Sequence, residues 1–388
     1  MHAAARWARA RGVRLAVATV DHGLRAESAA EAAATVRAAA SLGLPALALR
    51  WEGPKPTADV QAAARAARAA LLSAWAARDG LSAVALGHTF DDQAETVLLR
   101  LARGSGVDGL SGMAEASRRA GAVWLRPMLG IRRAALRAWL AAEGVAWIED
   151  PSNDALRFDR VRARRALAAL APLGLDAAGL VATAGRMACA RRALEAQTEA
   201  LAREAAVVGP CGEMRLAWAP LAAAEEEIAL RLLSRALRTV SGAAYGPRAV
   251  SLARLWRALC GDGFRGATLH GCVIGRRRAG GLATLWVARE PAACARGRGD
   301  APLWDGRWLL ETDAPGETGP LGEAGLAALR AAARAGAWTP PAYWPRAPRA
   351  ARLTTPALWR DGRLAAAPVA GYGEGMRATL ADAMAGAR

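Results

Sequence analysis

The first half of the chain alternates apolar runs of strand length with longer segments of helical pattern. The apolar runs cover residues 13–20, 46–51 and 82–86. The helical patterns cover residues 27–42, 57–78 and 91–103. Repeated βα units of this kind predict an α/β fold with a doubly wound parallel sheet, whose ligands lie at the carboxyl ends of the strands. Two such ends carry polar residues, at Asp21-His22 and at Gly87-His88.

Beyond Pro172 the pattern becomes mainly helical. Leucine or methionine recurs every seven residues at 180, 187, 194 and 201, which predicts one face of a long packed helix. Further helical patterns cover 222–240 and 248–260, and apolar runs at 267–275 and 282–288 predict a hairpin around Arg276, Arg277 and Arg278. Asp361-Gly362 predicts another hairpin. We therefore expect an α/β domain over residues 1–170, a mainly helical domain over 171–293 and a small α+β domain over 302–388.

The charge balance changes the picture of possible partners. Among 388 residues, 52 are Lys or Arg and 35 are Asp or Glu, which gives a net charge of +17, and Lys55 is the only lysine. Arginine binds phosphate bidentately, so this excess is compatible with a nucleic-acid partner. A genome rich in G and C also produces an arginine excess, so charge alone does not decide the question.

Membrane and disulfide-stabilised classes are not indicated. The sequence contains no apolar run of about 20 residues. Arg6, Arg9 and Arg11 stand where a signal peptide needs its apolar stretch. The five cysteines are odd in number, widely spaced and never in a C-x-x-C pair, which favours neither a disulfide framework nor a thiolate metal site. We predict a cytoplasmic protein with no membrane partner.

The densest group of reactive side chains lies at residues 87–96. His88 follows a predicted strand, while Asp91, Asp92 and Glu95 fall in the first turns of a predicted helix at mutual spacings of i,i+3 and i,i+4. Clustered carboxylates suit Mg²⁺ together with substrate phosphates, which makes Asp91 and Asp92 candidate metal ligands. The alternative is that these acids only complement the helix macrodipole.

Several arginine groups are candidate phosphate clamps. Arg65 and Arg68 are three residues apart on one predicted helix, and five arginines lie within residues 157–165. Arg103 precedes a glycine-rich loop at 104–113. The glycines of this loop either let the backbone bind an anion or form a helix C-cap followed by turns. The alternative for the arginines at 65–68 and 157–165 is that they only form solvent-exposed faces of helices and bind no phosphate. The basic turn containing Arg277 is a further candidate RNA contact.

Six segments, in this order and spacing, closely resemble the tRNA(Ile)-lysidine synthase family. They are residues 20–25, 64–68, 87–96, 99–106, 126–129 and 149–153. The resemblance covers residues 13–170 and is specific, whereas residues 171–388 resemble the family only in general character. It implies an ATP pyrophosphatase with the adenine nucleotide α-hydrolase-like fold, which uses ATP and Mg²⁺.

The resemblance also implies a reaction in two steps. The C2 oxygen of the wobble cytidine of an isoleucine tRNA with a CAU anticodon attacks the α-phosphate of ATP and releases pyrophosphate. The amine of free L-lysine then displaces AMP at C2. The assembly is left open, with a homodimer as one arrangement.

Each candidate residue receives an expected role from its pattern and from the resemblance. We expect His88, Asp92, Glu95 and Arg68 in catalysis. We expect Asp21, His22, Gly87 and Arg103 at the nucleotide. We expect Arg65, Arg160, Arg164 and Arg277 at RNA, and Asp91 and Asp92 at Mg²⁺.

Two departures from the family pattern affect these expectations. The phosphate-binding segment Ser-Gly-Gly-x-Asp-Ser is absent from the sequence. Because residues 1–11 have the pattern of the second half of the helix that follows that segment, we expect the missing strand and loop to be encoded just upstream of Met1, through a misassigned start or a truncated gene. The second departure is Arg160-Val161-Arg162, where the family has Arg-Asn-Arg.

A catalytically impaired tRNA-binding remnant is the alternative that the missing loop suggests. A tRNA 2-thiolation enzyme of the same fold needs paired cysteines, which the sequence lacks.

Overall fold

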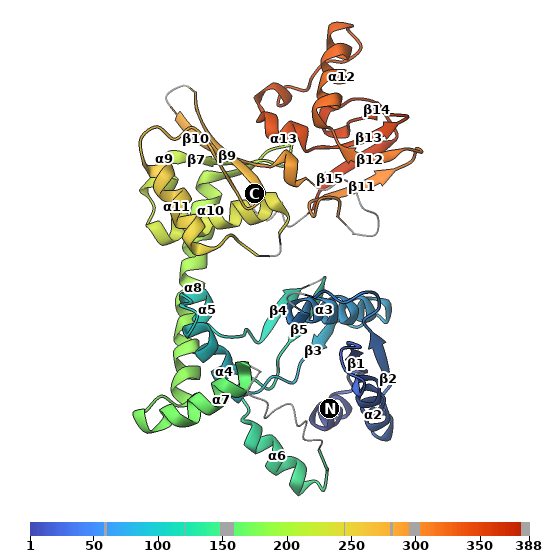
Figure 1. Cartoon of the computed structure of the whole chain (residues 1–388), viewed down its shortest axis with the longest axis vertical. Coiled ribbons are helices and arrows are strands. Elements are labelled where there is room, and N and C mark those ends of the chain that lie inside the picture. Colours follow the sequence, from blue (N-terminus) through green and yellow to red (C-terminus); the bar gives the residue numbers. More distant parts are fainter. Residues whose placement is uncertain are drawn as a thin grey trace. The chain divides into compact units, whose positions relative to one another are not determined.

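Figure 1 shows the computed structural model of the chain. The structure describes residues 1–57, 60–119, 121–147, 159–243, 245–279, 282–294 and 303–381. The chain divides into two compact units, Met1–Arg191 and Arg192–Arg388, which are described separately.

The first unit confirms the predicted alternation of strands and helices. Its elements are α1 (His2–Arg11), β1 (Val17–Asp21), α2 (Ser28–Ser41), β2 (Ala46–Arg50), α3 (Val60–Arg78), β3 (Ala83–Ala85), α4 (Phe90–Leu101), α5 (Val107–Leu110), β4 (Ala116–Arg119), β5 (Ala122–Leu125), α6 (Arg133–Ala142) and α7 (Asp159–Leu170). The helix α8 (Ala177–Ala205) begins in this unit and carries the predicted heptad positions.

The strands of the first unit form two sheets where the sequence predicted one. β1 pairs in parallel with β2, while β3 pairs in parallel with β5, which also pairs antiparallel with β4. No ladder joins β1 to β3 among the described residues, so the predicted doubly wound sheet is corrected to two separate sheets. α3 packs on β1, β3 and β5, and a shared apolar layer runs from Val20 and Leu49 through Leu72 and Trp75 to Trp124.

The start of α4 is determined by local hydrogen bonding. Thr89 is extended (φ −104°, ψ 175°) and is the N-cap residue, with Asp92 at the third helical position completing a capping box. The glycine-rich loop after α4 folds back onto this helix. Arg100 Nη1 donates to the carbonyl oxygens of Gly109 and Gly112, each at 2.8 Å, and Gln93 exchanges two hydrogen bonds with the Met113 backbone.

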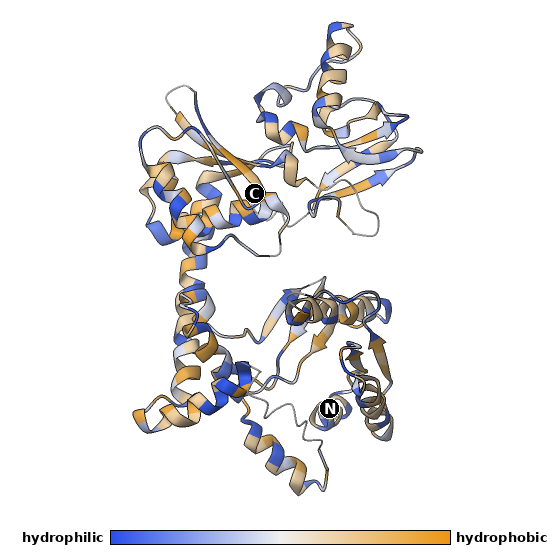
Figure 2. Cartoon of the chain, viewed as in Figure 1, coloured by the Kyte–Doolittle hydropathy of each residue, from blue (hydrophilic) through white to orange (hydrophobic). Residues whose placement is uncertain are grey.

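The second unit begins with a five-stranded sheet and its helices. The strands are β6 (Ala206–Val208), β7 (Met214–Ala217), β8 (Ala267–Leu269), β9 (Cys272–Ala279) and β10 (Leu282–Arg289), in the order β6-β7-β10-β9-β8. The helices are α9 (Trp218–Ala223), α10 (Glu226–Ser241) and α11 (Ala249–Cys260). Figure 2 shows hydrophobic and hydrophilic residues interleaved along these helices, as expected of helices that bury one face. Leu233 and Leu237 of α10 pack with Ile274 and Leu285 in the core.

The predicted β9–β10 hairpin is confirmed, but its arginines are not in the turn. Arg276, Arg277 and Arg278 belong to β9 and pair with β10. Arg276 lies over the Trp218 ring, 4.1 Å from its centre, so part of this basic segment faces the protein interior. The residues between the strands, 280–281, lie outside the described residues.

The end of the chain adds two small sheets. They comprise β11 (Trp308–Thr312) with β15 (Met376–Leu380), and β12 (Glu317–Pro320) with β13 (Pro356–Arg360) and β14 (Arg363–Ala366). The helices α12 (Gly322–Arg334) and α13 (Arg349–Leu353) accompany them. The predicted hairpin is confirmed, because Asp361 and Gly362 both have positive φ, at 49° and 72°. Trp308 and Trp344 are buried in the core.

Within the described ranges, no single helix is long and apolar enough to cross a membrane. One bent pair, 159–173 with 177–205, meets the length and composition criterion jointly, with a bend of 98°.

Candidate active site

His88 lies three residues beyond the carboxyl end of β3, close to the strand end where the sequence predicted it. The imidazole is partly buried, and in the described part of the chain its Nδ1 atom has no hydrogen-bond partner. Burial lowers the pKa of His88, Arg160 lowers it further, and Asp92 opposes both effects. The imidazole is therefore neutral at pH 7 and can accept a proton. A Cβ atom on Gly87 would meet Met128 Cε at 3.4 Å and nothing closer, so packing alone does not require glycine there.

Asp92 is held on both carboxylate oxygens. Its Oδ2 accepts hydrogen bonds from Thr89 N at 2.8 Å and Thr89 Oγ1 at 2.7 Å. Its Oδ1 lies 3.2 Å from Arg133 Nη2 and 3.6 Å from Arg160 Nη1. Burial opposes ionisation, but the two hydrogen bonds and the two arginines together lower the pKa of Asp92. The carboxylate is therefore charged and fixed in orientation at neutral pH.

Glu95 lies one turn along α4 from Asp92 and is almost fully buried, with 1% of its surface exposed. Its Oε1 lies 3.1 Å from Arg164 Nε and 3.6 Å from Arg133 Nη1. Its Oε2 is buried and has no partner in the described residues. A buried carboxylate oxygen without a donor is costly, which is typical of a functional site.

The predicted metal ligands have other roles in this arrangement. Asp91 Oδ2 accepts a hydrogen bond of 2.6 Å from Arg133 N, the first residue of α6, while both Asp92 oxygens face donors or cations. Over the described ranges, no group of three or more His, Cys, Asp or Glu side chains is placed to hold a metal ion. Asp91 and Asp92 thus contact protein groups here, and their role as Mg²⁺ ligands stays a prediction.

A second polar group lies at the end of β1. Asp21 Oδ1 accepts hydrogen bonds from Ser28 Oγ at 2.6 Å and Gly23 N at 2.8 Å, which lower the pKa of Asp21 and fix the turn. The His22 Nε2 atom lies 3.1 Å from Arg68 Nη2. Burial, followed by Arg68, lowers the pKa of His22, so its neutral ring accepts the guanidinium hydrogen.

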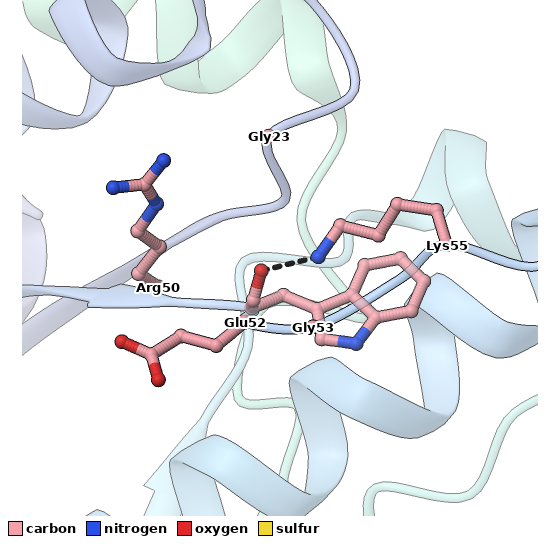
Figure 3. Close-up of a pocket in the computed structure, with 6 residues that line it drawn as sticks. Gly23, Arg50, Glu52, Gly53 and Lys55 are labelled. Atoms are coloured by element: carbon pink, nitrogen blue, oxygen red, sulfur yellow. Dashed lines mark hydrogen bonds between the residues drawn. The ribbon is translucent and has the colours of Figure 1, made fainter.

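Two cavities adjoin this strand end. One has a volume of about 310 Å³ and is lined by Gly23, Arg50, Trp51, Glu52, Gly53 and Lys55 (Figure 3). The Lys55 ammonium lies 4.1 Å from the centre of the Trp51 ring and donates to the Trp51 carbonyl oxygen, as the dashed line in Figure 3 indicates. The other has a volume of about 320 Å³, and its lining includes Thr19, His22 and Arg68. Both lie where a parallel α/β fold is expected to bind its ligand.

Arg68 connects the two polar groups. It contacts His22 directly, and its charge contributes, after several larger effects, to the lowered pKa of His88. Burial, followed by Arg65 and Arg160, lowers the pKa of Arg68 itself, so three of the predicted arginines lie within electrostatic range of one another.

Two other predicted residues have contacts with different partners. Arg103 forms an exposed ion pair of 2.9 Å with Asp159. Arg277 belongs to the second unit, where its Nη1 lies 3.5 Å from the Arg346 carbonyl oxygen. The segment 149–153 and Arg157 lie outside the described residues.

Sequence reasoning missed Arg133. It pairs with Asp92 and Glu95, which lie about forty positions earlier in the chain, so no local spacing signals the contact. The local signal that could have indicated Arg133 is its position in the first turn of the amphipathic helix α6.

Comparison with known proteins identifies the family. The PP-loop domain matches residues 1–171. The tRNA(Ile)-lysidine synthase of Ruegeria pomeroyi is 43% identical over 383 residues, which cover 98% of this chain and 87% of that protein. The chain belongs to the tRNA(Ile)-lysidine synthase family. The predicted family is thus confirmed, and its PP-loop domain supports the α/β class at the coarser level.

Other relatives of the same name agree. The tRNA(Ile)-lysidine synthase of Bradyrhizobium diazoefficiens is 42% identical over 319 residues, covering 77% of this chain and 88% of that protein. That of Rhodopseudomonas palustris is 53% identical over 201 residues, covering 51% of this chain and 58% of that protein.

A solved structure of the U34-tRNA thiolase NcsA from Methanococcus maripaludis is similar with a TM-score of 0.39 and 15% identity, over 45% of this chain and 63% of that chain.

Proposed function

We propose that this protein ligates L-lysine to C2 of the wobble cytidine of an isoleucine tRNA with a CAU anticodon. The reaction passes through an adenylated intermediate and releases pyrophosphate and AMP. The observation that carries the proposal is the 43% identity to a tRNA(Ile)-lysidine synthase over 98% of the chain. The arrangement of His88 and Asp92 supports it, because a neutral base lies within electrostatic range of a charged carboxylate.

The first step requires stabilisation of charge on phosphate. The cytidine C2 oxygen bonds to the α-phosphorus of ATP while the bond to pyrophosphate breaks. Arg68 and Arg160 place positive charge next to His88, where the developing charge is favoured. Mg²⁺ remains a predicted cofactor, and no step is assigned to it.

The second step requires a neutral amine. The lysine amine bonds to C2, AMP leaves with the oxygen, and the amine proton passes to a base. His88 suits that role because its ring is neutral and Nδ1 is unpartnered in the described residues. Asp92 and Glu95 supply the negative charge beside it that favours a cationic substrate group.

The remaining roles follow the same proposal. Asp21, His22 and the cavities at β1 suit the nucleoside part of ATP, and Gly87, two residues beyond β3, is assigned to the same nucleotide. Arg103 is engaged by Asp159 and reaches phosphate only if that exposed pair opens. Arg65, Arg160 and Arg164 are exposed and suit tRNA phosphates, and Arg277 suits them in the second unit. A cytoplasmic location and a homodimer remain predictions.

The test is lysidine formation on a CAU isoleucine tRNA transcript with ATP and labelled lysine. It is run on the 388-residue chain and on the longest in-frame product of its gene, because the Ser-Gly-Gly-x-Asp-Ser segment is absent here. We expect His88→Ala and Asp92→Ala to abolish product while tRNA affinity stays nearly unchanged, with His2→Ala as the matched histidine control.

Two results count against the proposal. If both forms bind tRNA and neither makes lysidine, the protein is an RNA-binding member of the family without catalysis. If the two variants lose tRNA binding and activity equally, His88 and Asp92 have a structural role instead.

A further inference from the structure

The start of α6 is docked on the start of α4 by backbone and side-chain contacts. Arg133 N donates to Asp91 Oδ2 at 2.6 Å, and Phe90 N donates to the Ile131 carbonyl oxygen at 3.0 Å. The Arg132 guanidinium lies 4.8 Å from the centre of the Phe90 ring. These contacts fix where the Arg133 side chain emerges relative to the acidic face of α4.

The Arg133 guanidinium bridges the two carboxylates of that face. One nitrogen lies 3.2 Å from Asp92 Oδ1 and the other lies 3.6 Å from Glu95 Oε1. Asp92 and Glu95 stand at i and i+3, where like charges on a helix repel. Among the described residues, Arg133 is the one arginine with ion pairs to both, and its side chain is only 29% exposed.

The arginines of α7 approach the same carboxylates differently. Arg160 pairs with Asp92 and Arg164 with Glu95, so each contacts one carboxylate only. Their side chains are 44% and 43% exposed. Both guanidinium groups reach solvent, so either arginine can turn from its carboxylate to a phosphate while Arg133 stays in contact with the buried carboxylates.

We propose that Arg133 is a positioning residue, the counter-ion that holds Asp92 and Glu95 in orientation while Arg160 and Arg164 exchange between these carboxylates and substrate phosphates. The inference rests on the proposed function, because it divides the arginines of that site into one that organises the carboxylates and two that bind substrate. Loss of Arg133 therefore impairs turnover, whereas loss of Arg160 impairs binding.

The kinetic experiment compares Arg133→Gln and Arg133→Lys in the full chain. The matched control is Arg137→Gln, on the same helix, whose guanidinium lies over the Trp147 ring. We expect Arg133→Gln to lower kcat by about 10- to 100-fold, as small misplacements of catalytic groups do, with KM for tRNA nearly unchanged. Arg133→Lys recovers part of kcat because it keeps the charge. Arg160→Gln raises KM for tRNA or ATP instead.

The pH profile separates this role from a merely structural one. Four charged or titratable groups surround the Asp92 carboxylate. His88 and Glu95 belong to the same segment as Asp92, Arg133 belongs to α6 and Arg160 belongs to α7. Without Arg133, less positive charge opposes protonation of Asp92, so the acid limb of kcat moves to higher pH in Arg133→Gln and stays in place in Arg133→Lys. A variant that was only less stable would lower the amount of active enzyme without moving that limb.

Histidine titration by NMR reads the same electrostatics without turnover. The chain has four histidines, and the His88 signal is assigned by its loss in His88→Ala. Removing Arg133 exposes His88 more fully to the Asp92 charge, so the His88 midpoint rises in Arg133→Gln and not in Arg133→Lys or Arg137→Gln. An unchanged midpoint in Arg133→Gln overturns the inference. An inactive wild type overturns the proposed function alone, because the titration still decides the role of Arg133.

Discussion

Replacing Thr89 with alanine tests whether the capping box at the start of α4 organises the candidate site. Thr89 Oγ1 donates to Asp92 Oδ2 at 2.7 Å and accepts from Asp92 N at 3.4 Å. Loss of an N-cap side chain costs about 1 kcal/mol. Because about 1 kcal/mol shifts the unfolding temperature of a unit of this size by about 2–4 °C, we expect a shift in that range for the first unit.

The same substitution has a predictable pH dependence. The pKa of Asp92 is lowered in the folded protein, so its contribution to stability is present above the unfolded value of about 3.9 and is lost as pH falls through the lower folded value. Both values lie in the acid range, so the penalty of Thr89→Ala stays constant between about pH 5.5 and about pH 8.

The assay is thermal unfolding followed by circular dichroism, with Thr89→Ser as the matched control because serine retains the hydroxyl. We expect the serine variant to unfold close to the wild-type temperature. The reasoning is refuted if Thr89→Ala matches Thr89→Ser, or if its penalty disappears between the two pH values.

Two further predictions concern the second unit. The Asp305 side chain is 1% exposed and lies 2.9 Å from both Arg289 and Arg307. Asp305→Ala leaves two buried cations without this partner, so we expect it to destabilise the unit by about 3–5 kcal/mol, measured by urea unfolding. A loss below about 1 kcal/mol contradicts this. Gly242 has φ 69°, and a Cβ atom there would lie 2.8 Å from the Asp305 carbonyl oxygen, which cannot move like a side chain. Gly242→Ala is therefore expected to lower the unfolding temperature, and an unchanged temperature argues against that steric clash.

Local signals predicted local structure well. The start of α4 was predicted within one residue, at Asp91 where the structure has Phe90, from the helical pattern of residues 91–103. The turn at Asp361-Gly362 was predicted because few residues tolerate two successive positive φ angles. His88 and Asp92 were predicted to lie close together for the same reason, because one strand end and one helix turn carry them, and Asp92 acts electrostatically on His88 in the structure.

Contacts between distant segments were not predicted. Whether β1 and β3 share one sheet depends on which strand edges meet, which their own apolar patterns do not encode. The arginines of β9 were expected in a turn, but the cation–π contact of Arg276 with Trp218 comes from a helix more than fifty positions earlier. Arg133 was overlooked because its carboxylate partners belong to another helix.

The solitary lysine offers a practical consequence. Lys55 lines the cavity at the end of β1, and apart from the chain's own amino terminus it carries the only primary amine in the sequence. An amine-reactive fluorophore therefore attaches at a single side chain without any engineered cysteine. The indole of Trp51 lies directly beneath that point of attachment, where it can quench the dye. The wild-type sequence thus already contains a reporter for occupancy of this cavity, readable by titrating ATP, lysine or tRNA in turn.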